Sequence, residues 1–458
     1  FQDGRVALFV SNIAHHSDIG GMAPGSMAGG MTEIYQEGVR IPPIRIVDGG
    51  EIVDEVMQLI LLNVRVPQER RGDYLSQIAG NRLGIRRLEE LFRRWSPAAL
   101  EEGCAEIIRS VARRMRAGIA EIPDGVYRFA DFLDDDGMGT TDIPIKVAIR
   151  IAGDTASFDF AGSGPQVRGN MNNSFAGLQA AVLFALKVLI DPEGPTNHGM
   201  LDPVRIAAPL GSVVNAVFPA ATAARAQTCQ RIIDVILGAL APALPGRVIA
   251  ASNGANGVAT LSGTGPDGRY YLYMETIGGG AGARAYKDGT DGVQVHVTNT
   301  SNLPIEALEN EYPLMIERYE LIEDSGGAGK FRGGLGLRRV YRALGHVVTF
   351  SGQGERCVHS PYGLFGGGPG RPGSLSIRHA SGRRVKLANK PASLEVSPDA
   401  AIVIETPGAG GYGPPRERSP ERRADDAASG KFSARFMRAS YQAAPEPSRA
   451  KRGRSRRR

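Results

Sequence analysis

Residues 125–160 read GVYRFADFLDDDGMGTTDIPIKVAIRIAGDTASFDF, and this stretch decides the fold class. Polar and apolar side chains alternate over residues 125–133, 143–151 and 157–160, which is the period of half-buried β-strands. Turn residues separate the three segments, so we expect a meander of antiparallel strands. The aspartates at 134–136 lack the other ligands and the closing glutamate of a calcium loop, and we interpret them as turn formers.

Segments with helical periodicity lie on both sides of this meander. Apolar residues recur there at the spacing of amphipathic or buried helices. The apolar run at residues 6–10 is interpreted as a buried strand, and short strands continue to residue 404. The sequence therefore predicts an α+β protein with a mixed or antiparallel strand-rich core and several amphipathic helices joined by glycine-rich loops. The expected helices are residues 51–66, 73–95, 97–119, 175–190 and 225–240.

The composition is that of a globular protein. The chain has 458 residues, of which 42% are hydrophobic and 22% charged. Its 60 glycines are nearly twice the usual share, and we interpret them as tight turns and close backbone contacts. No apolar run is long enough to span a membrane, and three scattered cysteines favour a reduced, cytoplasmic protein without disulfides.

The net charge of +6 comes from one end of the chain. Residues 449–458 carry seven positive charges, so the remaining 448 residues have a net charge of −1. No aromatic residue interleaves this basic run, and a role in nucleic-acid binding is therefore not favoured. We expect a folded region over residues 1–415 and a charged, disordered tail over residues 416–458, in which one short helix is possible within residues 420–441.

A second stretch, residues 11–43, concentrates ionisable groups in a glycine-rich loop. It reads SNIAHHSDIGGMAPGSMAGGMTEIYQEGVRIPP. The side chains of His15, His16 and Asp18 are a mixed nitrogen and oxygen set that suits zinc, manganese or iron. An extended chain puts His16 and Asp18 on one face, whereas a turn at His15 brings His15 and Asp18 together. Either arrangement supplies two ligands, so a metal site needs others from elsewhere; histidines bonded to nearby backbone are the alternative.

Four further polar residues are candidates for catalysis. Glu37 lies in the same loop, and Glu275 ends an expected strand directly before three glycines. His296 and Asn299 interrupt another strand just before a helix. Glutamate and histidine are the usual general bases in enzymes. A surface turn is the alternative for Glu275.

The order of the glycine-rich motifs resembles the hydantoinase B/oxoprolinase family over residues 5–415. The motifs that carry the resemblance are AHHSDIGG (14–21), GDYLSQIAGNRLGIRRLEEL (72–91), TCQRIIDVILGALAPALP (228–245), YMETIGGGAGAR (273–284), HVTNTSNLPIEALE (296–309), GLFGGGPGRPG (363–373) and ETPGAGGYG (405–413). They extend over nearly the full length of the chain.

The resemblance implies a B-type subunit of an ATP-dependent hydrolase that opens cyclic amides such as 5-oxoproline or hydantoins. An A-type partner would use the ATP and activate a carbonyl by phosphorylation, so a hetero-oligomer is expected. A related branch carboxylates ketones with a divalent metal, whose ligands map to His15 and Asp18 with His16 beside them. On this basis a metal would activate water, Glu37 or Glu275 would act as general base, and His296 and Asn299 would orient the substrate.

The sequence also departs from the family pattern. Members carry a section before the histidine loop, with a THLPD-like segment that resembles further metal ligands, and the sequence printed here begins without it. A ligand set confined to residues 1–458 is therefore expected to be incomplete. A ketone carboxylase subunit and a non-catalytic, partner-binding fragment remain as alternative hypotheses.

Overall fold

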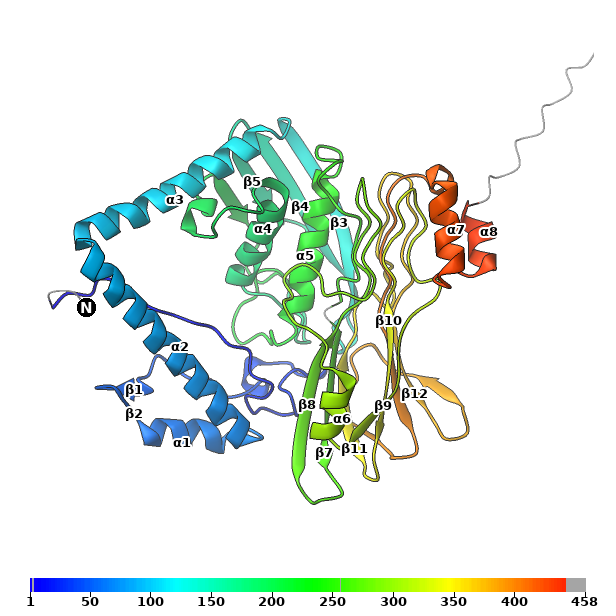
Figure 1. Cartoon of the computed structure of the whole chain (residues 1–458), viewed down its shortest axis with the longest axis horizontal. Helices are drawn as coiled ribbons and strands as arrows, with labels where there is room; N and C mark the ends of the chain where they lie inside the picture. The colour runs from blue at the N-terminus through cyan, green and yellow to red at the C-terminus, as the bar shows by residue number, and fades with distance from the viewer. Residues whose placement is uncertain (2–3, 256, 442–458) are drawn as a thin grey trace, which may run out of the picture.

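The predicted α+β class is confirmed by the computed structural model, which describes residues 1, 4–255 and 257–441 (Figure 1). The strands are β1 (Val47–Asp48), β2 (Glu51–Ile52), β3 (Gly125–Asp135), β4 (Thr141–Ala152), β5 (Thr155–Asp159), β6 (Val204–Ala207), β7 (Gly257–Thr264), β8 (Tyr270–Ile277), β9 (Leu314–Leu321), β10 (Leu337–Ala343), β11 (Val348–Gln353), β12 (Ser374–Arg378), β13 (Arg384–Lys386), β14 (Leu394–Val396) and β15 (Ala401–Glu405). The helices are α1 (Asp54–Leu62), α2 (Pro67–Arg94), α3 (Pro97–Ala120), α4 (Phe175–Ile190), α5 (Arg225–Leu240), α6 (Ile305–Glu311), α7 (Pro420–Ala428) and α8 (Ala434–Tyr441), with short 3-10 turns η1 (Ile34–Gln36), η2 (His198–Leu201) and η3 (Pro415–Glu417).

The predicted meander forms the first large sheet. β3 pairs with β4, and β4 with β5, in antiparallel register, while β6 joins β5 in parallel. α4 and α5 pack beside this sheet (Figure 1). Ile145 and Ile149 of β4 share one hydrophobic core with Ile232 and Ile236 of α5. Each such isoleucine contributes about 1.5–3 kcal/mol by burial, so this core fixes where α5 lies.

Two further sheets hold the C-terminal half together. One has the strand order β13-β12-β15-β10-β9 and the other β14-β11-β7-β8. The strand pairings within these two sheets are antiparallel. A second hydrophobic core, which includes Leu261, Phe350 and Ile402, lies between them. Among the described helices, none is long and apolar enough to cross a membrane.

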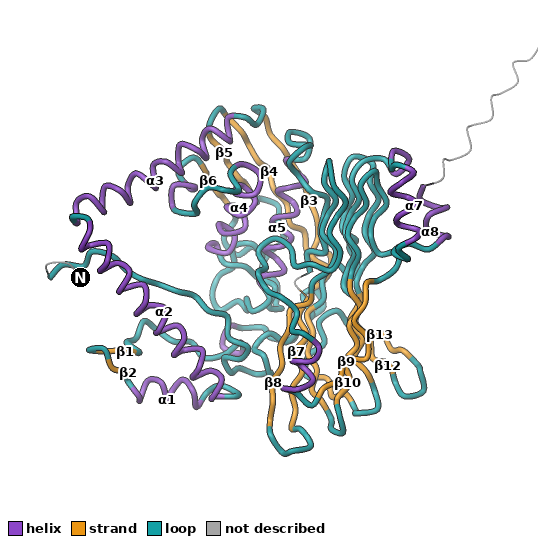
Figure 2. The backbone as a smooth tube through the Cα atoms, viewed as in Figure 1, coloured by secondary structure: helices purple, strands orange, loops and turns teal. Residues whose placement is uncertain are grey.

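Above these sheets, the glycine-rich loops run side by side (Figure 2). We call residues 277–293, 325–336, 361–373 and 406–413 the glycine layer. Neighbouring segments of this layer are joined by backbone hydrogen bonds. The N–H of Gly334 donates to the carbonyl oxygen of Ala281, and the N–H of Ala409 donates to the carbonyl oxygen of Gly334, each at 3.0 Å. A Cβ on Gly334 would lie 2.0 Å from a backbone oxygen of Thr290. The abundant glycines therefore serve close backbone contact, as the composition predicts.

The N-terminal arm differs from the sequence prediction. The run at residues 6–10 forms no regular strand, and Val6, Leu8 and Phe9 are exposed. It extends along α2 and α3, which project from the body (Figure 1). The buried-strand interpretation was wrong because a short apolar run does not show whether a partner strand exists.

The C-terminal part is ordered further than the predicted disordered tail, and the short helix considered possible within residues 420–441 is present as two helices. Residues 420–428 and 434–441 are helical, and α7 is tied to the glycine layer by buried ion pairs. The guanidinium of Arg418 lies 2.7 Å from Asp426 of α7 and 2.8 Å from Asp288, and Asp426 also pairs with Arg332 at 3.1 Å. The basic run at residues 449–458 lies outside the described residues.

Candidate functional site

Helix α5 is buried on all sides and yet carries charged residues. Arg231 and Asp234 have exposed fractions of 0%. Arg231 lies 3.1 Å from Asp131 of β3 and 3.3 Å from Glu355. Arg356 bridges Asp131 and Asp234 at 2.8 and 2.6 Å. Buried charges are stable only when they are paired, and these five form a connected network.

Asp234 connects this network to His296. Its Oδ1 atom lies 3.1 Å from Nε2 of His296, while its Oδ2 accepts from Arg356. Burial raises the pKa of Asp234, but Arg356 and His296 outweigh that effect and lower the pKa to about 2. Asp234 is therefore a carboxylate at neutral pH, and it favours the tautomer of His296 with a proton on Nε2 and the lone pair on Nδ1.

The backbone at His296 adopts a left-handed conformation. Its φ of +53° lies in a region that is uncommon for non-glycine residues, although asparagine, aspartate and histidine are enriched there. Arg356, which pairs with Asp234, also has a positive φ, of +58°. The imidazole edge also meets the ring of Phe184 from α4, with centroids 6.1 Å apart. Helices α4 and α5 thus hold the imidazole between them.

His296 lines a cavity of about 380 Å³, which is a suitable volume for a small ligand. One wall is apolar and comes largely from α4 and α5. The other wall is polar and contains no carboxylate among the described residues. The apolar wall includes Phe184, Val188, Leu189, Leu237, Ile249 and Val293, and the polar wall includes Arg247, Ser252, Arg284, Tyr286, Thr290, Gln294 and His296. Apolar lining beside polar groups that can orient a ligand is typical of substrate sites.

Asp18 is an anchor for its own loop. It is fully buried and accepts four hydrogen bonds, from the backbone N–H groups of Gly20, Gly25 and Arg65 at 2.9–3.0 Å and from the guanidinium of Arg65 at 3.1 Å. Both carboxylate oxygens are therefore occupied by N–H donors.

The neighbouring histidines do not join Asp18 in a ligand set. His15 is exposed, and His16 faces α2, where Nε2 lies 3.2 Å from Gln77 and Nδ1 lies 3.4 Å from Asp73. Arg70, a cation, pairs with the same Asp73 at 3.1 Å. Within residues 1, 4–255 and 257–441, no group of three or more histidine, cysteine, aspartate or glutamate side chains could hold a metal. The residues present do not fit the metal that the resemblance implies.

Glu37 fastens the histidine loop to the segment before α5. Its carboxylate accepts N–H bonds from Thr222 at 2.5 Å and Ala223 at 2.6 Å, and it is buried. Burial raises the pKa of Glu37, and hydrogen bonds from Ala223 and Thr222 oppose this only in part. Glu37 lines none of the cavities described here, so its clear role is to hold two chain segments together.

Two substitutions of Glu37 separate its role as a hydrogen-bond acceptor from the effect of its titration. We expect Glu37→Ala to lower the free energy of unfolding by about 1–3 kcal/mol, because two partly buried N–H groups lose their acceptor. Glu37→Gln keeps an acceptor oxygen and removes the titration. A raised pKa in the folded protein means that the contribution of Glu37 is present at low pH and is lost as pH rises above the ordinary value of 4.5.

Urea unfolding from pH 4 to 8 measures this contribution. The stability difference, wild type minus Glu37→Gln, should fall as pH rises through the raised pKa. Parallel pH profiles for the two proteins would contradict the assignment.

Glu275 and Asn299 occupy different surroundings. Glu275 is buried in β8, and its oxygens accept from Asn302 and Arg339 at 2.9 Å and from the hydroxyl of Tyr341 at 2.6 Å. These bonds make it a structural link between sheets. Asn299 is exposed, with no hydrogen bond recorded in the described part of the chain. Of the predicted site residues, only His296 lines a cavity of appreciable size.

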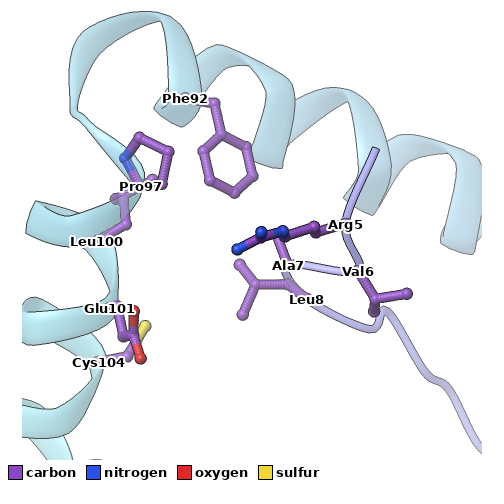
Figure 3. Close-up of a pocket in the computed structure, with 9 residues that line it drawn as sticks. All are labelled: Arg5, Val6, Ala7, Leu8, Phe92, Pro97, Leu100, Glu101 and Cys104. Carbon is purple, nitrogen blue, oxygen red and sulfur yellow. The ribbon is translucent and has the colours of Figure 1, made fainter. Parts of the chain in front are cut away.

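A larger hollow, of about 630 Å³, lies between the N-terminal segment and the junction of α2 and α3 (Figure 3). Figure 3 shows Arg5 and Leu8 on one side, facing Phe92, Leu100 and Cys104 on the other. Among its described lining residues there is no histidine, and the ionisable side chains are Arg5, Glu101 and Cys104.

Sequence reasoning missed Asp234, Arg356 and Arg284. A signal for Asp234 existed, because an aspartate between isoleucine and valine in an apolar helix (RIIDVILGAL, 231–240) requires a buried partner. No comparable signal marked Arg284, which follows the glycine run of motif 273–284.

With this geometry established, comparison with known proteins defines the class. The sequence profile described as hydantoinase B/oxoprolinase matches residues 1–415. The chain belongs to this family, as the motifs predicted. Relatives include 5-oxoprolinase 1 of Arabidopsis thaliana, which is 34% identical over 90% of this chain and 33% of its own length. Caprolactamase subunit beta of Pseudomonas jessenii is 31% identical over 91% of this chain and 74% of its own length.

Solved structures agree with this assignment. The ATP-dependent caprolactamase of Pseudomonas jessenii superimposes with a TM-score of 0.84 and 28% identity, over 93% of this chain and 75% of that one. An acetone carboxylase structure shares the fold, with a TM-score of 0.85 at 20% identity, over 93% of this chain and 63% of that one. The chain spans about three quarters of the caprolactamase subunit and a third of the 5-oxoprolinase.

Proposed function

We propose that this chain is the B-type subunit of an ATP-dependent hydrolase that opens the ring of a small cyclic amide. An A-type subunit would use ATP to phosphorylate the amide carbonyl oxygen, and this subunit would complete hydrolysis. The observation that carries the proposal is His296, held by the buried carboxylate of Asp234 at the wall of a 380 Å³ cavity. Relatives named as an oxoprolinase and an ATP-dependent caprolactamase support the reaction class.

The chain's own residues would supply a general base and an apolar surface for the substrate ring. Nδ1 of His296 would accept a proton from water as that water attacks the activated carbon. Asp234 would stabilise the resulting imidazolium, a role suited to a buried carboxylate. The apolar wall formed by Phe184 and Leu237 would cover the ring carbons. The ring C–N bond then breaks with the electron pair leaving on nitrogen, which takes a proton, and an acyl phosphate remains. A second water displaces phosphate from it, so that cyclic amide, ATP and two waters yield the ring-opened amino acid, ADP and phosphate.

No step is assigned to a metal, because the side chains at His15, His16 and Asp18 do not converge as ligands. Asn299, predicted to orient the substrate, stays a prediction. Glu275 and Glu37 are likewise not given the base role, because N–H or O–H donors already occupy their oxygens.

The test combines this chain with an A-type subunit of the family and ATP. We expect ring-opened product and ADP to appear together only when both subunits are present, with 5-oxoproline, hydantoin or caprolactam as substrate. A family enzyme of known activity serves as the positive control. Incorporation of labelled bicarbonate into acetone instead would indicate a carboxylase. Co-purification of the two subunits without turnover of any cyclic amide would contradict the proposal and indicate a non-catalytic, partner-binding role.

A further inference from the structure

The cavity beside His296 carries positively charged side chains, whereas residues 1–448 as a whole have a net charge of −1. Arg247, Arg284 and His296 line it, and no aspartate or glutamate does so among the described lining residues. The nearest acidic group behind His296 is Asp234, whose charge is matched by Arg356 at 2.6 Å. The cavity therefore presents arginine side chains and no carboxylate to whatever enters it.

The two arginines differ in how they are engaged. Arg247 is paired with Glu121 at 2.6 Å, at the protein surface. Arg284 has no ion pair and no side-chain hydrogen bond within the described part of the chain. Its backbone is nevertheless fixed, because its N–H donates to Lys287 at 2.9 Å and it forms a bridge to Ile249. The guanidinium of Arg284 is therefore available to a ligand, and the backbone that carries it is held in place at the edge of the cavity.

We propose that this cavity binds a small cyclic amide that carries an anionic group, and that the Arg284 guanidinium pairs with that anion. The apolar wall suits the ring carbons, and the fork of a guanidinium suits the two oxygens of a carboxylate or phosphate. The inference rests on the proposed function, whose substrate class it narrows from cyclic amides in general to anionic ones. The anion has two possible sources, a carboxylate of the substrate or a phosphate added to it.

Binding to the purified chain, without partner or ATP, tests this proposal. The probes are L-5-oxoproline, its neutral analogue 2-pyrrolidinone, and inorganic phosphate, measured by calorimetry. We expect 5-oxoproline to bind more tightly than 2-pyrrolidinone. Arg284→Gln should weaken the binding of 5-oxoproline by about 10–100-fold, the loss of a hydrogen bond to a charged group. The same change should leave the affinity for 2-pyrrolidinone unaffected. Arg284→Lys should weaken the binding of 5-oxoproline less than Arg284→Gln does.

Arg269→Gln is the matched control, because Arg269 is exposed, lies beside Asp267 and does not line the cavity. If phosphate competes with 5-oxoproline, and if the binding of phosphate is lost in Arg284→Gln, then phosphate is a second source of the anion. Equal affinity of wild type and Arg284→Gln for 5-oxoproline would overturn the proposal. So would equal affinity of the wild type for the charged and neutral rings, or no anion binding at millimolar concentration. Turnover of a neutral cyclic amide in the two-subunit assay would then leave the proposed function standing.

Discussion

Replacing His296 with glutamine is expected to lower kcat of cyclic amide hydrolysis by about 10²–10⁴-fold, the usual contribution of a general base. Glutamine keeps a hydrogen bond to Asp234 but cannot accept a proton near neutral pH. The affinity for 5-oxoproline should change little, because Arg284 rather than His296 pairs with the anion. The two-subunit assay with ATP measures kcat, and calorimetry measures binding.

Asp234→Asn distinguishes a base from a structural histidine. It removes the carboxylate that orients and supports His296, so kcat should fall and its pH profile should shift. It also breaks a buried pair with Arg356, for which a cost of about 3–5 kcal/mol in unfolding free energy is expected. His379→Gln is the control, because His379 is exposed. If His296→Gln retained wild-type kcat while remaining folded, the site assignment would fail.

Gly334→Ala is expected to cost at least about 4 kcal/mol in the free energy of unfolding. The added methyl would lie 2.0 Å from the oxygen of Thr290 and 2.8 Å from the nitrogen of Ala281. Both contacts are with backbone, and that backbone is held by hydrogen bonds across the glycine layer. Relief therefore requires separating neighbouring chains rather than turning a side chain.

Urea denaturation of wild type and variant measures this cost, and loss of soluble protein would be its extreme form. Gly246→Ala is the control, because a Cβ there meets nothing within 4 Å and its φ is not positive. It should change stability by less than about 0.5 kcal/mol. A loss below about 1 kcal/mol for Gly334→Ala would show that the layer can separate easily, contrary to its packing.

Much of the fold could be predicted because the relevant signals are local. Helices 175–190 and 225–240 have long apolar patterns, and their bounds agree with α4 and α5. The meander was predictable because alternation persists through three successive segments. Details that depend on a single bond were less accessible: Ser174 caps α4, although Asn172 and Asn173 just before it are residue types that cap helices equally well. Asn172 instead bonds within its own loop.

The candidate site was harder to predict because its parts are distant in sequence. His296 and Asp234 are 62 positions apart, and only the packing of α5 brings them together. Asp18 illustrates the converse problem. Its neighbours in sequence suggested a ligand, but a carboxylate in a glycine-rich loop can equally be occupied by the backbone N–H groups around it. Sequence spacing does not distinguish these outcomes.

The ion pairs that join α7 to the glycine layer bear on where this protein can be divided. The family profile ends at residue 415, yet Asp426 lies eleven positions later and is a buried partner of Arg332. A protein shortened to residue 415 would lose Arg418 as well, which leaves Asp288 without its closest cation. The unit that folds cooperatively therefore extends past residue 415, where the match to the family profile ends.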